Sequence, residues 1–475
     1  MSKSNAMINL PDALKTKPLA TISTMNVETN ILDPITFSNN SALFVLQNKG
    51  ILDAGSRITF SVTSTAAASE KMFLYGKTGI ASLIERAVLR VGSNIVAETN
   101  GFNHYETIRK QFKTQEELLQ KDSVKCGYWA SGMANASGGR MAYMAGVDNS
   151  LGVANATQYR AYEITNDPET TAVFSIGLSE LFPMMFSVQL PLFVMAQPVS
   201  IELTFATQGA SGNAIAGADT TVGGTDKAVV PNKINCQFLS DTLTYDDGRM
   251  METAKIVASD NGLTYPYEDI VLTEATIPAV ADPGAGAKTD QEVVRDVGLT
   301  GQSVRTLLVA DTDAAADNIL GPYVSSAFVA PDSFNLVVND EVIYNRPVVN
   351  ECRRQNELSQ VFNTDINVSQ CEFSFNSAIP ADGPYTVNNP LIDATATFEG
   401  HNQNTVQAKN HYNGINLSTS PFNEWGSGIE IGQKPLRLLR TLPRGHTDFG
   451  QRNMKVWAMC EKAFNLKNGV VSVTA

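Results

Sequence analysis

The sequence of 475 residues has little charge and no long apolar run. Asp, Glu, Lys and Arg make up only 17% of it, and its formal net charge is −13. An acidic chain lacks the basic surface that grips nucleic-acid phosphates, so we expect no specific nucleic-acid binding. The most apolar stretch, 181–196, contains two prolines and is shorter than the roughly 20 residues of a transmembrane helix. We therefore expect no membrane-spanning segment.

Cysteine and histidine are scarce and scattered. The chain has no CxxC pair and no apolar stretch near its start that would serve as a signal peptide, which favours free, buried thiols in a reducing compartment. The five cysteines are Cys126, Cys236, Cys352, Cys371 and Cys460. Neither HxxxH nor HExxH occurs among His104, His401, His411 and His446. We expect no metal site and no cofactor.

The sequence also lacks a convincing catalytic motif. Gly76-Lys77-Thr78 and the segment 283–289 resemble parts of a phosphate-binding loop, but neither has the glycine spacing that such a loop needs. Ser179 and Ser187 are not framed as Gly-x-Ser-x-Gly. Asp311-Thr-Asp313 is interpreted as an acidic loop without the remaining ligands of a calcium site. We predict no catalytic, cofactor-binding or metal-binding residue, and no enzymatic activity.

What the sequence does contain is strand alternation. Val199–Phe205 follows a Gln-Pro pair and alternates apolar and polar residues, which predicts a strand with one face in a core. Just before it, 176–185 has near-helical apolar spacing around Glu180, and 188–195 is interpreted as an apolar strand interrupted by Pro191.

This pattern returns later in the chain. A second Gln/Pro-led strand, Leu436–Leu442, lies 433 − 197 = 236 positions on. A hairpin over 84–97 with a Gly92-Ser93 turn matches a hairpin over 333–344 with an Asn339-Asp340 turn, at an offset of 339 − 92 = 247. Each hairpin precedes a helical segment, 104–112 or 349–358. The repetition predicts a tandem duplication of one β-domain, with chance similarity of common hairpins as the alternative.

The length predicts two domains, because a chain of this size exceeds what one core can fill. We expect an N-terminal arm over 1–20, a first β-domain over 21–250 and a second over 251–475. Long stretches rich in small or polar residues interrupt both halves and are expected to be loops: 126–165, 207–226, 275–290 and 378–414.

Several segments resemble the double jelly-roll major capsid proteins of the adenovirus, polinton and large-DNA-virus lineage, and most of all those of polinton-like viruses and virophages. The resemblance covers most of the chain. The segments that carry it are Ile31–Ile35, Phe44–Asp53, Gly177–Phe182, Leu190–Phe193, and the regions around Pro435 and Val456-Trp457.

The resemblance implies an all-β protein with two tandem eight-stranded jelly-roll β-sandwiches, long inserted loops and short helices. Three chains would form a pseudo-hexameric capsomer that tiles an icosahedral shell, with the loops outside and the arm inside. Neighbouring capsomers, penton proteins and minor or cement proteins would be its partners. The protein would be located in the virion after synthesis in the host cytoplasm or nucleus.

Two other functions stay open from the sequence. One is a receptor- or carbohydrate-binding tandem β-sandwich of the spike type, although only three tryptophans are available for aromatic binding surfaces. The other is a glycan lyase or hydrolase built on a β-sandwich, whose paired carboxylates have no distinguishing sequence context.

Overall fold

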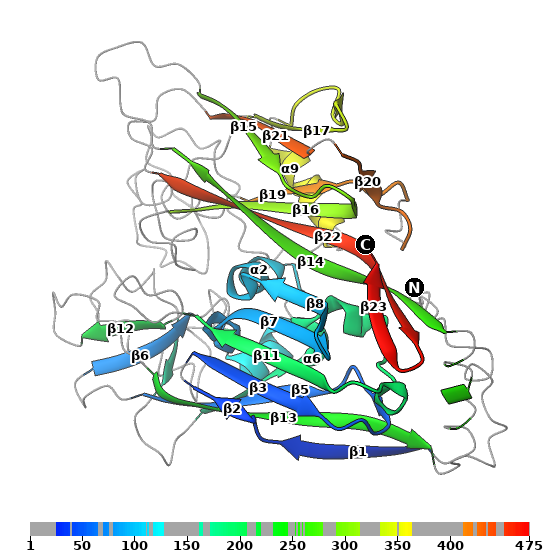
Figure 1. Cartoon of the computed structure of the whole chain (residues 1–475). Helices are drawn as coiled ribbons and strands as arrows, with labels where there is room; N and C mark the ends of the chain where they lie inside the picture. The colour runs from blue at the N-terminus through cyan, green and yellow to red at the C-terminus, as the bar shows by residue number, and fades with distance from the viewer. Residues whose placement is uncertain are drawn as a thin grey trace.

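The computed structural model consists mostly of antiparallel strands with a few short helices (Figure 1). It describes residues 25–38, 40–64, 70–75, 79–110, 112–113, 117–127, 161–164, 172–206, 215–219, 231–245, 252, 255–256, 259, 262–278, 291–313, 333–348, 351–362, 412–420, 425–433, 436–442 and 451–474.

The first half folds into a sandwich of two antiparallel sheets, ordered β1-β13-β5-β10 and β3-β11-β7-β8. If these eight strands are counted along the chain, the sheet orders become 1-8-3-6 and 2-7-4-5, which is the jelly-roll arrangement of two Greek keys. The strands are β1 (Met25–Leu32), β3 (Ser41–Leu46), β5 (Arg57–Ser64), β7 (Ile84–Val91), β8 (Asn94–Asn100), β10 (Ala172–Gly177), β11 (Val199–Phe205) and β13 (Pro231–Tyr245).

The second half repeats this topology. Its sheets have the orders β14-β22-β16-β19 and β15-β21-β17-β18, again 1-8-3-6 and 2-7-4-5 along the chain. The predicted pair of eight-stranded jelly rolls is therefore confirmed. The strands are β14 (Leu263–Ile277), β15 (Gln291–Val297), β16 (Gln302–Asp313), β17 (Ser333–Val338), β18 (Glu341–Val342), β19 (Tyr412–Asn416), β21 (Leu436–Leu442) and β22 (Arg452–Lys467).

Shorter elements decorate the two sandwiches. The additional strands are β2 (Thr36–Phe37), β4 (Ile51–Leu52), β6 (Glu70–Tyr75), β9 (Ala161–Ile164), β12 (Ile215–Asp219), β20 (Ile429–Ile431) and β23 (Val470–Thr474). The α-helices are α2 (Phe102–Lys110), α3 (Ser123–Cys126), α6 (Leu178–Leu181) and α9 (Glu351–Val361). The remaining turns of helix are η1 (Gly79–Leu83), η2 (Glu117–Asp122), η5 (Pro183–Phe186) and η6 (Leu192–Val194). No helix among the described residues is long and apolar enough to cross a membrane.

The alternating pattern places the core as predicted. All four apolar side chains of β11 are buried, and the residues between them are only partly buried. They join Phe44, Phe60 and Phe238 in one cluster between the two sheets. Alternation is sufficient here because successive strand residues point to opposite faces.

The two predicted landmarks lie side by side in each sandwich. Gly92 has a φ of 59°, and its N–H donates to the carbonyl of Pro198 at 2.9 Å. In the second sandwich, Asn339 and Asp340 both have positive φ, as a type I′ turn requires. Gly432 then donates its N–H to the side chain of Asn339 at 3.1 Å. The hairpin turn thus contacts the segment before the Gln/Pro-led strand in both halves.

Two sequence interpretations are wrong. The segment 188–195 is not a strand: Leu190 forms a single bridge with Leu52, and a turn of 3-10 helix follows at Leu192–Val194. Pro191 has no N–H, so it cannot continue a ladder. Asp311–Asp313 is not a loop but the end of β16, paired with β22. There the backbone ladder outweighs the weak strand propensity of Asp.

Other expectations have mixed outcomes. The predicted helices are present as α2 and α9. The supposed loops 126–165 and 207–226 contain the strands β9 and β12, and the supposed loops 275–290 and 378–414 overlap the strands β14 and β19. The other residues of these four segments lie almost entirely outside the described part of the chain, as do 1–20 and the Gly76–Thr78 motif. The domain limits at 20/21 and 250/251 stay predictions.

Replacing Val199 with Asp should unfold the first sandwich. The side chain is fully buried, and an unpaired charge there should cost about 4 kcal/mol or more. Urea unfolding followed by circular dichroism measures the loss. Ser200→Asp is the matched control, because Ser200 lies on the other face, opposite Arg90. Wild-type stability of Val199→Asp would contradict the assignment of the strand's faces.

Candidate functional site: the junction between the two sandwiches

The free edge of β8 is covered by the second sandwich. Among the described strands, β8 is the last of its sheet, so one side of its backbone has no strand partner there. Such an open edge is a common source of aggregation. Side chains of β14 and β22 bind that edge at every second residue: Tyr267 donates to the carbonyl of Val96, Asp269 accepts from the N–H of Glu98 at 3.3 Å, and Trp457 donates to the carbonyl of Asn100 at 3.2 Å. These contacts take the place of a further strand.

The same strands complete the core of the first sandwich. Its apolar cluster includes six residues of the second half: Leu263, Tyr265, Tyr267, Phe464, Leu466 and Val471. At the turn between β22 and β23, the carbonyl of Gly469 accepts from the N–H of Ala196 at 3.0 Å. Figure 1 shows β14, β22 and β23 running beside β7 and β8. The second half therefore completes the core of the first sandwich, while the second sandwich also has a separate apolar core of its own, which includes Phe334 and Leu438.

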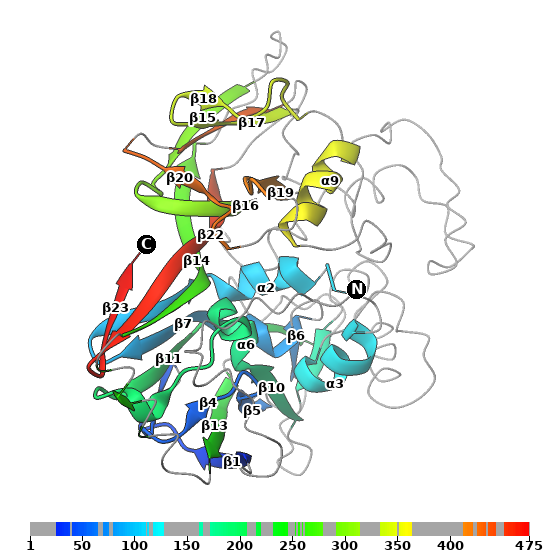
Figure 2. The same ribbon diagram turned by 90° about the vertical axis from the view of Figure 1, so that its right-hand side faces the viewer.

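A separate apolar cluster lies between α2 and the outer face of the sheet β14-β22-β16-β19. Tyr105 and Ile108 of α2 pack there with Ile270, Leu308 and Trp457. Phe112, just after α2, stacks on Phe362, just after α9, with ring centroids 4.3 Å apart. Figure 2 shows α2 at the level where the sandwiches meet, with α9 on the second sandwich. Tyr105, Ile108 and Phe112 of the predicted helical segment 104–112 are thus buried against the other half of the chain.

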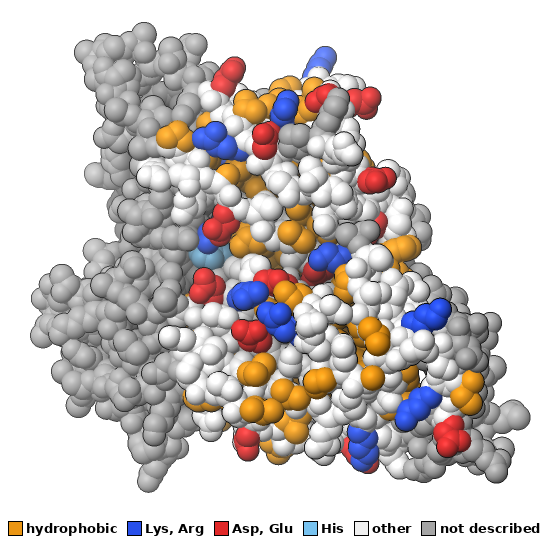
Figure 3. Space-filling view, viewed as in Figure 1, with side chains coloured by type: hydrophobic (Ala, Val, Ile, Leu, Met, Phe, Trp, Pro, Cys, Tyr) orange, Lys and Arg blue, Asp and Glu red, His pale blue; other side chains and the backbone are white. Residues whose placement is uncertain are grey.

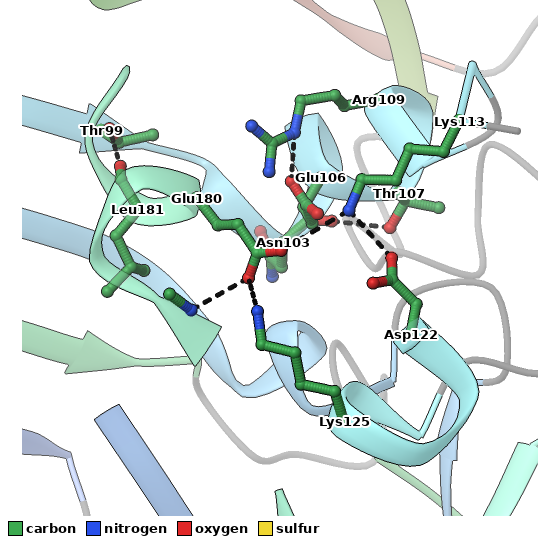
Figure 4. Close-up of polar contacts among 11 residues, drawn as sticks. Thr99, Asn103, Glu106, Thr107, Arg109, Lys113, Asp122, Lys125, Glu180 and Leu181 are labelled. Atoms are coloured by element: carbon green, nitrogen blue, oxygen red, sulfur yellow. Dashed lines mark hydrogen bonds and ion pairs between the residues drawn. The ribbon is translucent and has the colours of Figure 1, made fainter. Parts of the chain in front are cut away.

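A cluster of ion pairs surrounds the segment just after α2 (Figure 4). Glu180 of α6 accepts from the N–H of Gly177 at 3.0 Å and from Lys125 at 3.1 Å, and it lies 3.6 Å from Lys113. Lys113 also binds Asp122, the last residue of η2, at 2.9 Å. These contacts connect the end of α2 with α3 and α6. They therefore fix the position of α2 where it packs against the second sandwich.

The cluster keeps Glu180 ionised. Burial alone would raise the pKa of this carboxyl, but Lys113, Lys125 and Arg109, together with the Gly177 N–H, outweigh burial and lower the pKa to about 2. On the other side of the junction, burial raises the pKa of Asp269 although Lys462 lies 2.6 Å away. The junction therefore contains charges that are stable only with their partners in place.

The chemistry-bearing residues that the structure describes do not come together. Among the described residues, no group of three or more His, Cys, Asp or Glu could hold a metal ion. Cys126, Cys236 and Cys460 are free and buried, as predicted, and burial raises the pKa of each thiol, to about 11 for Cys126 and about 12 for the other two. His104 is buried in α2. His401, His411, His446 and Cys371, and the side chain of Cys352, lie outside the described part.

The sequence predicts little of the junction. Its patterns include Glu180 and Trp457 but give neither residue a partner, and they do not mark Tyr267, Asp269 or Lys113. One signal was available for Glu180: a carboxylate inside an apolar segment must find a cation or a backbone donor. No comparable local signal marks the residues that cover β8.

Comparisons with known proteins bear on this geometry. No protein-family model matches the chain, and no curated protein matches it in sequence. Among solved structures, VP54 of PBCV-1, fitted into a reconstruction of the virophage Sputnik, has a TM-score of 0.56 at 11% identity over 95% of this chain and 97% of that one. The mavirus major capsid protein has a TM-score of 0.52 at 10% identity over 98% and 95%. The chain has the double jelly-roll fold of a viral major capsid protein. The Faustovirus major capsid protein is similar as well, with a TM-score of 0.50 at 10% identity over 93% and 90%.

At such low identity the likeness concerns the whole double jelly roll rather than individual residues. It extends over both sandwiches of this chain and nearly the full length of each of these proteins. The predicted resemblance to double jelly-roll capsid proteins is therefore confirmed at the level of the fold.

Removing the hydroxyl of Tyr267 should weaken the junction. Tyr267→Phe leaves the Val96 carbonyl without its donor, which should cost about 1–2 kcal/mol of unfolding free energy. Tyr265→Phe is a matched control, because the buried Tyr265 hydroxyl has no hydrogen-bond partner in the described part of the chain, and its removal should cost nothing. Chemical denaturation compares the two variants, and equal losses would show that the hydroxyl does not cover the β8 edge.

Neutralising Glu180 should destabilise the protein most at pH values above 4.5. Because folding lowers the pKa of Glu180 from 4.5 to about 2, its contribution, about 3 kcal/mol, is complete above pH 4.5 and is lost as the pH falls toward 2. Glu180→Gln should therefore be less stable than the wild type at pH 7, and the difference should shrink below pH 4.5 in denaturation series.

The control for this prediction is Glu28→Gln. Glu28 forms an exposed ion pair with Lys49, and its loss should cost less than about 0.5 kcal/mol. A Glu180→Gln penalty that does not change between pH 7 and pH 3 would show that the charge is not responsible.

Proposed function

We propose that the chain is a viral major capsid protein with a structural, non-enzymatic role, and that three copies form a pseudo-hexameric capsomer. The observation that carries the proposal is the pairing of two sandwiches of identical strand order, held together by side chains of the second half that enter the core of the first sandwich. Because its two sandwiches are similar, one chain can fill two neighbouring positions of a six-membered ring. Three such chains supply six units, and head-to-tail contacts close the ring around a threefold axis.

The surface supports assembly in many copies. Figure 3 shows a face made mainly of uncharged groups, on which charged side chains are scattered instead of forming one basic or acidic patch. Low charge density reduces the repulsion between identical subunits brought together in a shell. The net charge of −13 favours a shell protein over one that lines a packaged genome.

The finer assignments belong to this proposal. The capsomers would contact one another, penton proteins and minor or cement proteins in an icosahedral shell. The protein would be located in the virion after synthesis in the host cytoplasm or nucleus. Residues 1–20 would form an inward arm, 21–250 the first jelly roll and 251–475 the second.

The native mass tests the proposal. Light scattering coupled to size exclusion should give about three times the chain mass of 51.2 kDa, or a larger particle, and electron microscopy of that fraction should show hexagonal outlines. A stable monomer that forms no particle would argue against a capsid protein. Glycan-binding screens of that monomer would then test the receptor- or carbohydrate-binding alternative.

A further inference from the structure

Asp269 and Lys462 form a buried contact where the two cores meet. Asp269 lies on β14 and Lys462 on β22, and their side chains are 3% and 18% exposed. Along the same face of β22, Cys460 belongs to the core of the second sandwich and Phe464 to that of the first. The pair therefore occupies the point at which both strands leave one core and enter the other. Figure 1 shows the two strands passing from the second sandwich to the edge of β8.

The two side chains lie in the arrangement of reacting groups. The Nζ of Lys462 is 2.6 Å from Oδ2 of Asp269, so the nitrogen lies beside the carboxyl carbon to which Oδ2 is bonded. The other oxygen, Oδ1, accepts from the N–H of Glu98 at 3.3 Å. A backbone donor at this oxygen stabilises the negative charge that develops when a nucleophile adds to the carboxyl carbon. Because the fold holds the two groups in contact, their reaction is unimolecular.

The protonation state of the carboxyl favours the same reaction. Burial raises the pKa of Asp269, and this effect outweighs Lys462 and the N–H groups of Glu98 and Ile270, which lower it. The folded chain therefore favours the neutral acid, which is the electrophilic form, over the carboxylate. When Asp269 takes its proton from Lys462, the same transfer leaves a neutral amine, which is the nucleophilic form.

A second buried contact between a lysine and an aspartate differs in this respect. Lys113 lies 2.9 Å from Asp122, and the two side chains are 22% and 5% exposed. Burial lowers the pKa of Lys113, but the carboxylates of Glu106, Asp122 and Glu180 outweigh burial and raise it. That amine stays protonated and is not a nucleophile. The Lys113–Asp122 pair is thus an internal control for contact without reaction.

We propose that Lys462 and Asp269 form an intramolecular isopeptide bond once the chain has folded. The Nζ of Lys462 attacks Cγ of Asp269, so that the Nζ–Cγ bond forms and the Cγ–Oδ2 bond breaks. Two protons of the ammonium group leave with Oδ2 as one water molecule, and the third stays on the amide nitrogen. The step needs no oxidant and no cofactor. Because the site is buried, water has little access to it and hydrolysis of the new amide is suppressed.

The bond fixes the junction covalently. It connects residues that are 193 positions apart, and a crosslink across so long a loop restricts the unfolded chain. Oδ1 becomes the amide oxygen and still accepts from the N–H of Glu98, so the edge of β8 keeps this part of its cover. The bond lies within one chain, and the inference does not rest on the proposed assembly.

The intact mass of the purified full-length protein, measured after denaturation, tests the bond. The wild type should be lighter than its sequence mass by one water molecule. Lys462→Arg keeps the positive charge but cannot form the amide, so this variant should have its full sequence mass. Lys113→Arg, at the internal control pair, should keep the deficit. Protease digestion of the wild type should give a branched peptide that contains Asp269 and Lys462.

Two results would overturn the inference: a wild type of full sequence mass, and a water deficit that persists in Lys462→Arg, because the dehydration would then lie elsewhere. If Lys462→Arg fails to fold, judged by circular dichroism, Asp269→Asn replaces it. Its side chain can lose only ammonia in this reaction, so a water deficit in that variant contradicts the bond as well. These masses do not depend on the oligomeric state, so absence of the bond leaves the capsid proposal intact.

Discussion

The covered edge of β8 is the contact on which the arrangement of the two sandwiches depends. A jelly roll has open edges, and an edge strand needs a partner for its backbone groups. Here Tyr267, Asp269 and Trp457 provide that partner, while neighbouring apolar residues of the same strands enter the first core. Directional hydrogen bonds and apolar burial therefore act on one surface. Together they fix the side-by-side arrangement of the two sandwiches.

The fold was largely predictable because its signals are local or repeated. Each signal determines the conformation of only a few neighbouring residues. The structure contains the alternating strand Val199–Phe205 and the turns at Gly92 and Asn339-Asp340 where they were predicted. The failures have local causes as well. Pro191 interrupts a segment whose composition favours a strand, and Asp311–Asp313 joins a ladder although its composition favours a loop.

The junction was not predictable in the same way. Tyr267 is 171 positions from Val96, and Trp457 is 357 positions from Asn100, so no periodicity within a segment relates them. The buried face of α2 was visible in the sequence, but the surface that buries it was not. The same holds for Glu180: its apolar surroundings indicate that it needs a cation, whereas only the folded chain places Lys113 and Lys125 beside it.

The entry of residues from the second half into the core of the first sandwich also has a consequence for the order of folding. The first sandwich is built from residues near the beginning of the chain, yet its core contains Phe464, Leu466 and Val471. During synthesis, that core has no complete set of packing partners until the segment beyond residue 460 has left the ribosome. Contacts of such sequence separation form slowly, so the apolar surface of the nascent first half stays accessible while the second half is made. The two sandwiches are therefore expected to complete folding together. Cellular chaperones, which bind exposed apolar surface, should bind the chain mainly before its last strands are synthesised.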